Sequence, residues 1–200
     1  MLEILIATNN AGKIKEIKDM LVDSNINILT IDDFPHLPKI KEDGKTFQEN
    51  ALKKACKISQ YTGKICLADD SGLEIDYLKG EPGICSSRWG NTDKDRINKV
   101  LNLLKNVPEN KRSAKFICVL VLAFPDGRTY IVKEECPGNI SLTPRGKYGF
   151  GYDPIFLIPE YNQTFAELGQ KIKNKISHRG KALKKMIEVI NKFVVSENSR

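Results

Sequence analysis

Apolar residues recur along the first part of the chain at two spacings, one typical of strands and the other of helices. Residues 2–7 form a short apolar run, which predicts a buried strand. Ile14, Ile17 and Leu21 then fall on one face of a helix, with lysine and glutamate residues opposite them. Over residues 26–31, Ile26, Ile28 and Thr30 alternate with Asn27, Leu29 and Ile31, which predicts a second strand. The chain is therefore expected to begin with a strand, a helix and another strand.

The middle of the chain continues this alternation. A capping box at Thr46-Phe-Gln-Glu49 predicts the start of a second helix, and Asp93 is a candidate cap for a third. Between them, residues 65–68 predict a short strand that ends at Asp69. The apolar positions of the two helices are Phe47, Ala51, Ala55, Ile58, Ile97, Val100, Leu101 and Leu104.

A hairpin and a last helix complete the pattern. Residues 116–124 and 128–132 flank Pro125-Asp126-Gly127, a strong signal for a β-hairpin. Ser177 is placed to cap a final helix, and residues 196–200 are expected to form a frayed tail. Helices that alternate with strands, followed by a hairpin, predict an α/β fold with a mixed sheet.

Length and composition narrow the class of protein. The 200 residues are 40% hydrophobic and 28% charged, which excludes an intrinsically disordered chain. No repeat or linker divides the sequence, so one domain over residues 1–200 is expected. The longest apolar run, 116–124, is about half of the ~20 residues that a membrane-spanning helix needs. The N-terminus lacks the basic residues and the cleavage site of a signal peptide, which predicts a cytoplasmic protein.

Charge and cysteine content add two expectations. The formal net charge of +7 favours a polyanionic partner, namely a nucleic acid, a nucleotide or an acidic membrane surface, without choosing among them. The basic residues are spread along the chain, so an ordinary solvated surface is an equally good explanation. The five cysteines include no C-x-x-C pair, which predicts reduced thiols and argues against a zinc site.

Two polar motifs follow predicted strands. Residues 8–13, Thr-Asn-Asn-Ala-Gly-Lys, join a strand to a helix N-terminus, where backbone N–H groups and a lysine suit a phosphate; the alternative is a plain helix cap. Asp69-Asp70-Ser71-Gly72 places two adjacent carboxylates at the end of residues 65–68, where a hard cation such as Mg²⁺ would offset their repulsion. A solvated turn is the alternative there, and it is favoured for the second acidic pair, Glu42-Asp43.

Two further motifs lie in the second half of the chain. Residues 149–154 intersperse the aromatic residues Phe150 and Tyr152 with glycines 149 and 151, which permits a flat ligand to stack but is also common turn chemistry. His178 and Arg179 open the last helix after three spaced lysines, which suits an anion or a carbonyl group. A structural role for His178 is the alternative. Taken together, the four motifs predict a binding site for a nucleoside triphosphate with Mg²⁺.

The order of these motifs resembles the inosine triphosphate pyrophosphatase family of the RdgB type, over nearly the whole chain. The resemblance is carried by residues 5–13, 46–51, 68–73, 80–83, 144–146, 149–154 and 177–183. It implies hydrolysis of ITP, dITP and XTP to the monophosphate and pyrophosphate, a house-cleaning of the nucleotide pool. It also implies an elongated, two-lobed α/β fold with a long mixed sheet flanked by helices, the active site in the cleft between the lobes, and a homodimer.

The resemblance assigns roles to residues of this sequence. Asp70 is implied to bind Mg²⁺ and to help activate the attacking water, with Asp69 and Glu42 as further candidate metal ligands. Phe150 is implied to stack on the base. The implied substrate-binding residues are Thr8, Asn9, Asn10, Ala11, Gly12, Lys13, Ser71, Phe150, Gly151, Tyr152, Asp153, Lys173, His178 and Arg179.

The sequence departs from the family pattern at two places, and two other functions are possible. Lys41 precedes Glu42 where the family often carries a second acid, and Ser86-Ser87-Arg88-Trp89 replaces a Ser-Ala-Arg-Tyr segment. A nucleic-acid-binding protein would require a continuous basic stripe, which the scattered lysines and the acidic pair do not favour. A nucleotide-binding module without catalysis is the third possibility. Neither a nucleic acid nor a membrane is therefore the expected partner.

Overall fold

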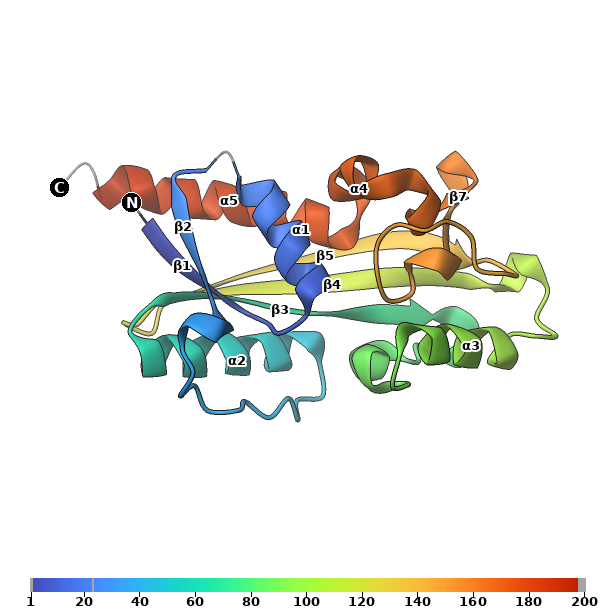
Figure 1. Cartoon of the computed structure of the whole chain (residues 1–200), viewed down its shortest axis with the longest axis horizontal. Coiled ribbons are helices and arrows are strands. Elements are labelled where there is room, and N and C mark those ends of the chain that lie inside the picture. Colours follow the sequence, from blue (N-terminus) through green and yellow to red (C-terminus); the bar gives the residue numbers. More distant parts are fainter. Residues whose placement is uncertain (1, 23, 198–200) are drawn as a thin grey trace. The chain divides into compact units, whose positions relative to one another are not determined.

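A mixed β-sheet runs through the protein, with strands in the order β2-β1-β3-β4-β5-β6-β7. The computed structural model describes residues 2–22 and 24–197 (Figure 1). β1 pairs in parallel with β2 and β3, whereas β6 is antiparallel to both β5 and β7, so the predicted α/β class with a mixed sheet is confirmed. The strands are β1 (Leu2–Ala7), β2 (Ile26–Thr30), β3 (Ile65–Ile75), β4 (Ser113–Ala123), β5 (Thr129–Ile140), β6 (Phe156–Ile158) and β7 (Gln163–Thr164). The α-helices are α1 (Ala11–Leu21), α2 (Phe47–Thr62), α3 (Asp93–Leu103), α4 (Phe165–Ile176) and α5 (His178–Glu197).

The chain folds into two compact units. The first comprises residues 1–70, 118–134 and 179–200, and the second comprises residues 71–117 and 135–178. β3, β4 and β5 each contribute residues to both.

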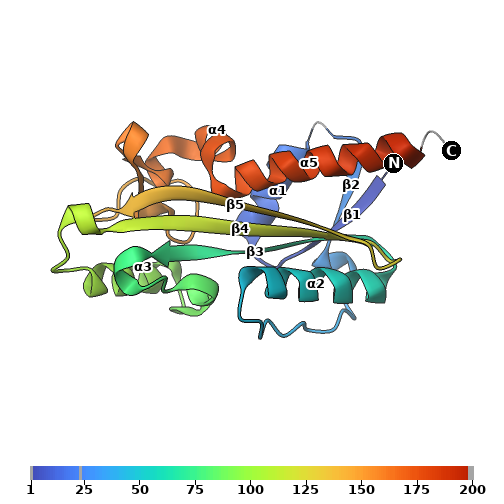
Figure 2. The same ribbon diagram turned by 180° about the vertical axis from the view of Figure 1, so that it is seen from behind.

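The first unit has helices on both faces of its strands. α1 and α5 lie on one side and α2 on the other (Figures 1 and 2). Alternate residues of the strands meet α1 and α5, because successive side chains of a strand point to opposite faces. The core on that side consists of Ile4, Ile6, Ile17, Leu21, Leu67, Cys118, Leu120, Leu122, Phe124, Ala182, Leu183, Met186 and Ile190.

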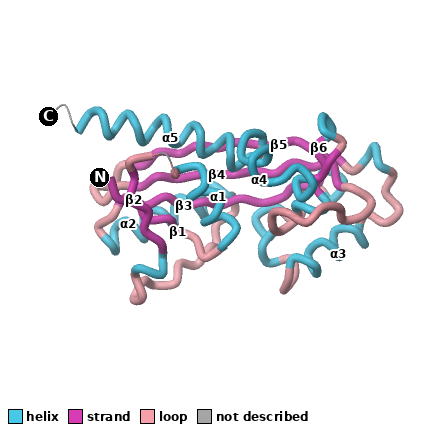
Figure 3. The backbone as a smooth tube through the Cα atoms, turned by 45° about the horizontal axis from the view of Figure 1, so that its top comes forward, coloured by secondary structure: helices cyan, strands magenta, loops and turns pink. Residues whose placement is uncertain are grey.

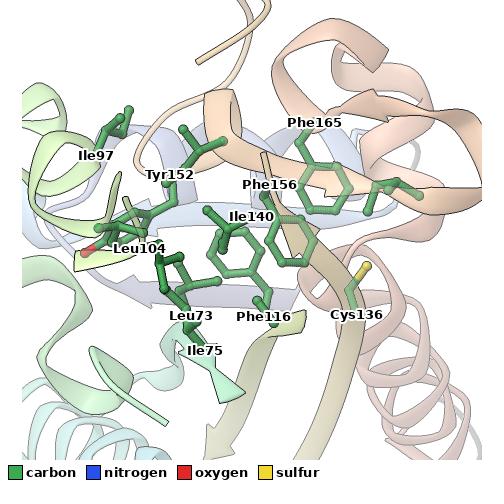
Figure 4. Close-up of a cluster of buried hydrophobic side chains, with 14 of the residues drawn as sticks. Leu73, Ile75, Ile97, Leu104, Phe116, Cys136, Ile140, Tyr152, Phe156 and Phe165 are labelled. Carbon is green, nitrogen blue, oxygen red and sulfur yellow. The ribbon is translucent and has the colours of Figure 1, made fainter. Parts of the chain in front are cut away.

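The second unit has an aromatic core. Phe116 of β4 lies 4.5 Å from Phe156 of β6, measured between ring centroids, and Phe156 lies 5.2 Å from Phe165 of α4 (Figure 4). Leu73 and Ile140 pack into the same cluster, with residues of α3 at its edge. The second unit therefore has a core of its own.

Helix starts follow the sequence pattern closely. The Thr46 hydroxyl accepts a hydrogen bond from the N–H of Glu49 at 3.1 Å, as the capping box predicts. The Glu49 carboxylate accepts from the N–H of Lys45, one residue earlier than the standard box. α3 is capped by Thr92, whereas Asp93 is its first residue. The Asp93 carboxylate is thus available for another role, described below.

Three features of the fold differ from the sequence prediction. β3 (Figure 3) continues to Ile75 instead of ending at Asp69. The acidic pair therefore lies inside a strand. α4 and the short strands β6 and β7 were not predicted. Ser196 and Glu197 are helical rather than part of a tail, and residues 198–200 lie outside the described residues.

The thiols and the lengths of the helices complete the description of the fold. All five cysteines are free, as predicted, and Cys85 alone among them is exposed. None of the helices in the described part of the chain combines the length and the apolar character needed to cross a bilayer.

Candidate functional site

The loop between β1 and α1 leaves a helix N-terminus open to an anion. Asn10 caps α1, since its side-chain oxygen accepts a hydrogen bond from the N–H of Lys13 at 3.0 Å. The hydroxyl of Thr8 accepts from the N–H of Asn10 at 3.2 Å. Asn9, Asn10 and Ala11 are exposed, and Gly12 is partly so. The loop therefore presents the positive end of the α1 dipole, as the sequence predicted for a phosphate site.

Asp69 and Asp70 contact different sets of residues although they are adjacent in β3. The Asp69 carboxylate meets Lys13 of α1 and Arg179 of α5. Asp70 instead accepts a hydrogen bond from Asn50 of α2, and the charges of Lys13 and Lys54 act on it without such a bond. This division follows from the alternation of side chains along a strand. The two acids therefore do not form a single pair of carboxylates.

The Asp69 carboxylate is fully buried between two cations. Its Oδ1 lies 2.5 Å from the Lys13 ammonium nitrogen, and its Oδ2 accepts a hydrogen bond from Arg179 Nε at 2.7 Å. The thiol of Cys118 lies 3.4 Å from the same Oδ2. Burial opposes ionisation, but the charges of Arg179 and Lys13 outweigh it and hold the pKa of Asp69 well below its ordinary value. Asp69 is thus a permanent anion of the site.

Arg179 is held by a second carboxylate. Its Nη1 lies 2.5 Å from Oε2 of Glu16, which is 3% exposed and lies one turn after Lys13 on α1. Burial alone would lower the pKa of Arg179, yet the charges of Asp69 and Glu16 raise it. Glu16 was not singled out in the sequence, although it is an acid on the buried side of an amphipathic helix.

Asp70 has the opposite electrostatic environment. It is 8% exposed, and its Oδ2 has no hydrogen-bond partner among the described residues. Burial raises the pKa of Asp70 to about 6, and the negative charge of Glu42 adds to the rise. The charges of Lys13 and Lys54 and a hydrogen bond from Asn50 oppose it only in part. A buried carboxylate without full compensation is a common property of functional sites.

Lys54 of α2 is a functional candidate that sequence reasoning missed. Its ammonium nitrogen lies 2.7 Å from Oε1 of Glu42 and 3.0 Å from the backbone oxygen of Asp69. The residue is only 8% exposed. Its position between Ala51 and Ile58, on the apolar side of the predicted helix, was the available signal. Lys54 therefore adds a second ammonium group beside Asp70.

The carboxylates of Asp70 and Glu42 are suitable ligands for a hard divalent cation. Asp70 supplies an unpartnered buried oxygen, and Glu42 lies near enough to raise its pKa. Within the described part of the chain, no group of three or more histidine, cysteine, aspartate or glutamate residues is arranged to hold a metal ion. Mg²⁺ usually takes one or two carboxylates and completes its shell with water and substrate phosphates, so this donor set is sufficient.

In the second unit, two carboxylates hold the glycine-rich loop at 149–153. The Phe150 N–H donates to Asp153 Oδ2 at 2.9 Å, and the Gly151 N–H donates to Asp93 Oδ2 at 2.7 Å. The Tyr152 hydroxyl donates to the backbone oxygen of Ser86 at 2.9 Å. Tyr152 and Asp153 are buried, whereas Phe150 and Gly151 are partly exposed. The loop is thus fixed from three sides and leaves Phe150 at the surface.

Lys173 of α4 joins the same loop. Its ammonium group forms a buried ion pair with Asp153 and lies 4.6 Å from the centroid of the Phe150 ring. Gly149 has φ +79°, and a Cβ atom there would lie 2.0 Å from the Asp153 carboxylate. A glycine is therefore required at this position.

His178 and Ser71 complete the predicted residues of the second unit. The His178 ring stacks on Phe116, with 4.6 Å between ring centroids and 11° between planes. Ser71 is half-buried and directly follows Asp70 in β3.

The predicted residues thus form two groups. Thr8, Asn9, Asn10, Ala11, Gly12, Lys13, Asp69, Asp70, Arg179 and Glu42 belong to the first unit, and Ser71, Phe150, Gly151, Tyr152, Asp153, Lys173 and His178 to the second.

The fold and these charged groups define an α/β protein with a helix N-terminus suited to phosphate and a buried acid beside two lysines. The chain belongs to the Ham1 family, whose sequence profile matches residues 4–189. A dITP/XTP pyrophosphatase of Desulforamulus reducens is 46% identical, with 98% of this chain and 99% of that protein aligned. A dITP/XTP pyrophosphatase of Bacillus cereus is 43% identical over 98% of each chain.

Solved structures of the family agree with this membership. A HAM1 protein from Coxiella burnetii matches with a TM-score of 0.87 and 43% identity, covering 96% of this chain and 100% of that one. The Staphylococcus aureus Ham1 protein matches with a TM-score of 0.82 and 38% identity, covering 98% and 99% of the two chains. The α/β fold implied by the sequence resemblance is therefore the fold of the family.

Proposed function

We propose that this protein hydrolyses non-standard purine nucleoside triphosphates, namely ITP, dITP and XTP, to the monophosphate and pyrophosphate. The observation that carries the proposal is the buried, incompletely paired carboxylate of Asp70 beside Lys13 and Lys54. It occurs in a chain 46% identical to a protein named for this activity. The activity would remove damaged purines from the nucleotide pool, and we place it in the cytoplasm.

The α1 N-terminus and the two lysines would bind the triphosphate. Residues 9–11 are exposed at the positive end of the α1 dipole, and Lys13 and Lys54 offer positive charge. Negative charge on the leaving pyrophosphate grows as the bond to the α-phosphorus breaks. Fixed cations near the phosphates therefore stabilise the transition state more than the ground state.

Asp70 and Glu42 would hold a Mg²⁺ ion, which when bound supplies charge neutralisation and Lewis acidity at the phosphates. Burial raises the pKa of Asp70 to about 6 when no metal is bound, and a bound cation would favour its ionised form. The Asp70 carboxylate would then orient the attacking water by accepting a hydrogen bond from it. The water oxygen forms a bond to the α-phosphorus, the bond to pyrophosphate breaks, and the proton of the water passes to solvent or to the departing pyrophosphate.

Asp69 would position the cations instead of binding the metal. Both of its oxygens are already engaged, one by Lys13 and the other by Arg179. Removing it would break the buried ion pair with Arg179 and the ion pair with Lys13, which is strongly destabilising. This role separates the two adjacent acids into a structural anion and a reactive one.

The residues of the second unit would recognise the base. Phe150 offers a partly exposed ring for stacking, and Lys173 and Asp153 lie beside it. The imidazole of His178, the first residue of α5, would donate a hydrogen bond to the base. Hypoxanthine and xanthine carry an acceptor at position 6, where adenine carries a donor. A site built from N–H donors would therefore reject ATP, because two donors would face each other unpaired.

The test is pyrophosphate release from ITP, XTP, GTP and ATP at fixed Mg²⁺ concentration. We expect kcat/KM for ITP and XTP to exceed that for ATP by at least about 10²-fold. Asp70→Asn serves as the inactive control. Comparable rates for ITP and ATP would refute the assignment of substrate, and release of orthophosphate in place of pyrophosphate would refute the assignment of reaction.

Two further features belong to the same proposal. We infer a homodimer, which light scattering after size-exclusion chromatography would test. We expect no nucleic-acid or membrane partner, because the two acids of β3 lie among the cations that a phosphate backbone would contact. A filter-binding assay with single-stranded DNA at low salt would detect such a partner.

A further inference from the structure

The imidazole of His178 lies almost parallel to the ring of Phe116. The ring centroids are 4.6 Å apart, and the planes differ by 11°. His178 is the first residue of α5, and Phe116 lies in β4, 62 positions earlier in the chain. Both side chains are buried, at 3% and 8% exposure. The stack is therefore a packed contact within the second unit.

Phe116 is itself fixed by two other rings. Phe156 lies 4.5 Å away with its plane tilted by 52°, and Phe165 lies 6.1 Å away with its plane tilted by 25° (Figure 4). Phe156 and Phe165 are fully buried, with no exposed surface. Close packing of this kind leaves a ring little freedom to turn. The face that Phe116 presents to His178 is thus rigid.

We propose that Phe116 is a positioning residue that sets the plane of the His178 imidazole, and through it the selectivity for 6-oxo purines. This inference rests on the proposed function, in which His178 donates to the base. The outer torsion of a histidine side chain is broad and poorly restrained by itself. Stacking restrains that torsion through the faces of the ring, whereas the ring nitrogens form their hydrogen bonds in the plane of the ring.

The selectivity follows from the direction of the hydrogen bond. An N–H donor that tilts away from its acceptor weakens steeply once the angle falls below about 120°. ITP would lose this bond when the imidazole turns, whereas ATP has no acceptor at position 6 to lose. Loss of the stack should therefore lower kcat/KM for ITP and leave that for ATP nearly unchanged. A net hydrogen bond is worth roughly 1 kcal/mol, so the ITP/ATP ratio should fall by about 5- to 10-fold.

The experiment compares Phe116→Leu with Phe156→Leu. Both variants remove one ring from the same aromatic cluster, but only the first removes the ring that stacks at 11° on His178. The ITP/ATP ratio of kcat/KM should fall by about 5- to 10-fold in Phe116→Leu and by clearly less in Phe156→Leu, where the stacking ring stays in place and loses only one of its two neighbours. An unchanged ratio in Phe116→Leu, or an equal fall in both variants, would overturn the inference.

A second readout does not depend on activity. The chain has two histidines, His36 and His178, so the imidazole proton signals can be assigned by elimination. A ring stacked on Phe116 shifts the His178 signals upfield, while exposed His36 serves as an internal reference. The shift should disappear in Phe116→Leu and persist in Phe156→Leu. Unshifted His178 signals in the unmodified protein would disprove the stack.

A further variant and the proton spectra distinguish a failure to fold, or a lack of activity, from a failure of the inference. Phe116→Met fills more of the vacated space than leucine and replaces Phe116→Leu if the latter does not fold. If the unmodified protein did not hydrolyse ITP at all, the proposed function would fail. The proton spectra would then still decide whether Phe116 orients the imidazole.

Discussion

Replacement of Asp70 by asparagine should inactivate the protein and at the same time stabilise it. Burial raises the pKa of Asp70 to about 6 from an ordinary value of 3.8. A difference of one pKa unit corresponds to about 1.4 kcal/mol, so the ionised carboxylate destabilises the folded protein by about 3 kcal/mol above pH 6. Asparagine has nearly the same shape and carries no charge. Asp70→Asn should therefore raise the free energy of unfolding at pH 8 by up to about 3 kcal/mol.

The size of this stabilisation depends on pH in a defined way. Because the folded-state pKa is the higher one, the folded protein binds the proton more tightly than the unfolded chain does. The wild-type protein is thus least penalised below pH 4 and loses stability as the pH rises through 6. The advantage of Asp70→Asn should be absent near pH 4, should appear between pH 4 and 6, and should be complete at pH 8.

Urea unfolding at several pH values, with a chelator present, measures this directly. Asp43→Asn is the matched control, because Asp43 lies on the surface and a hydrogen bond from Lys53 lowers its pKa. That variant should show no gain at pH 8. Added Mg²⁺ should stabilise the wild-type protein and not Asp70→Asn. A gain that is absent at pH 8, or equal at pH 4 and pH 8, would refute the assignment of a strained carboxylate.

Three further substitutions test the rest of the site. Lys54→Met should lower kcat/KM for ITP by about 10- to 100-fold through loss of a charged hydrogen bond. Lys57→Met, at an exposed position of the same helix, should keep kcat/KM within about 2-fold of the unmodified protein, and equal losses in the two variants would exclude Lys54 from the phosphate site. Asp69→Asn should cost about 3–5 kcal/mol in urea unfolding at pH 7, because it breaks the ion pairs that a fully buried carboxylate forms with Lys13 and Arg179. A cost below about 1 kcal/mol would contradict the ion-pair network. Gly149→Ala should raise the KM for ITP at least about 10-fold, because its Cβ would lie 2.0 Å from a carboxylate oxygen of the same loop. The Cβ of Gly151→Ala meets no atom within 4 Å, so the KM of that variant should be lower than that of Gly149→Ala. The reverse order of the two KM values would show that backbone strain rather than this clash governs the loop.

Local patterns in the sequence were sufficient to predict most helices and strands of the first unit. The apolar stripe at Ile14, Ile17 and Leu21 predicted α1, and the capping box at Thr46 predicted α2. These elements have strong signals because one face of each packs against the sheet and the other meets solvent. The hairpin around Pro125-Asp126-Gly127 was predicted for a similar reason, since its turn residues specify the backbone.

Long-range pairing explains what was missed. The acidic pair was read as a strand end, because two carboxylates inside a buried strand are costly unless partners are supplied. Those partners are Lys13 and Arg179 for Asp69, and Asn50 and Lys54 for Asp70, at separations that no local pattern reveals. The kink of α4 at Gly169, with φ +74°, similarly hid the helix from its apolar spacing.

The alternation of Asp69 and Asp70 constrains how the sequence can vary in length. A one-residue insertion between Gly63 and Asp69 would reverse the two faces of β3 and exchange the surroundings of the two acids. An insertion of two residues would restore the faces but displace the acids along the strand by about 6.6 Å. Insertions and deletions among relatives should therefore avoid this segment and occur in loops such as residues 34–45, where no strand requires its side chains to alternate between two faces. The spacing from the end of α2 to Asp70 is in this sense as much a part of the site as the carboxylates themselves.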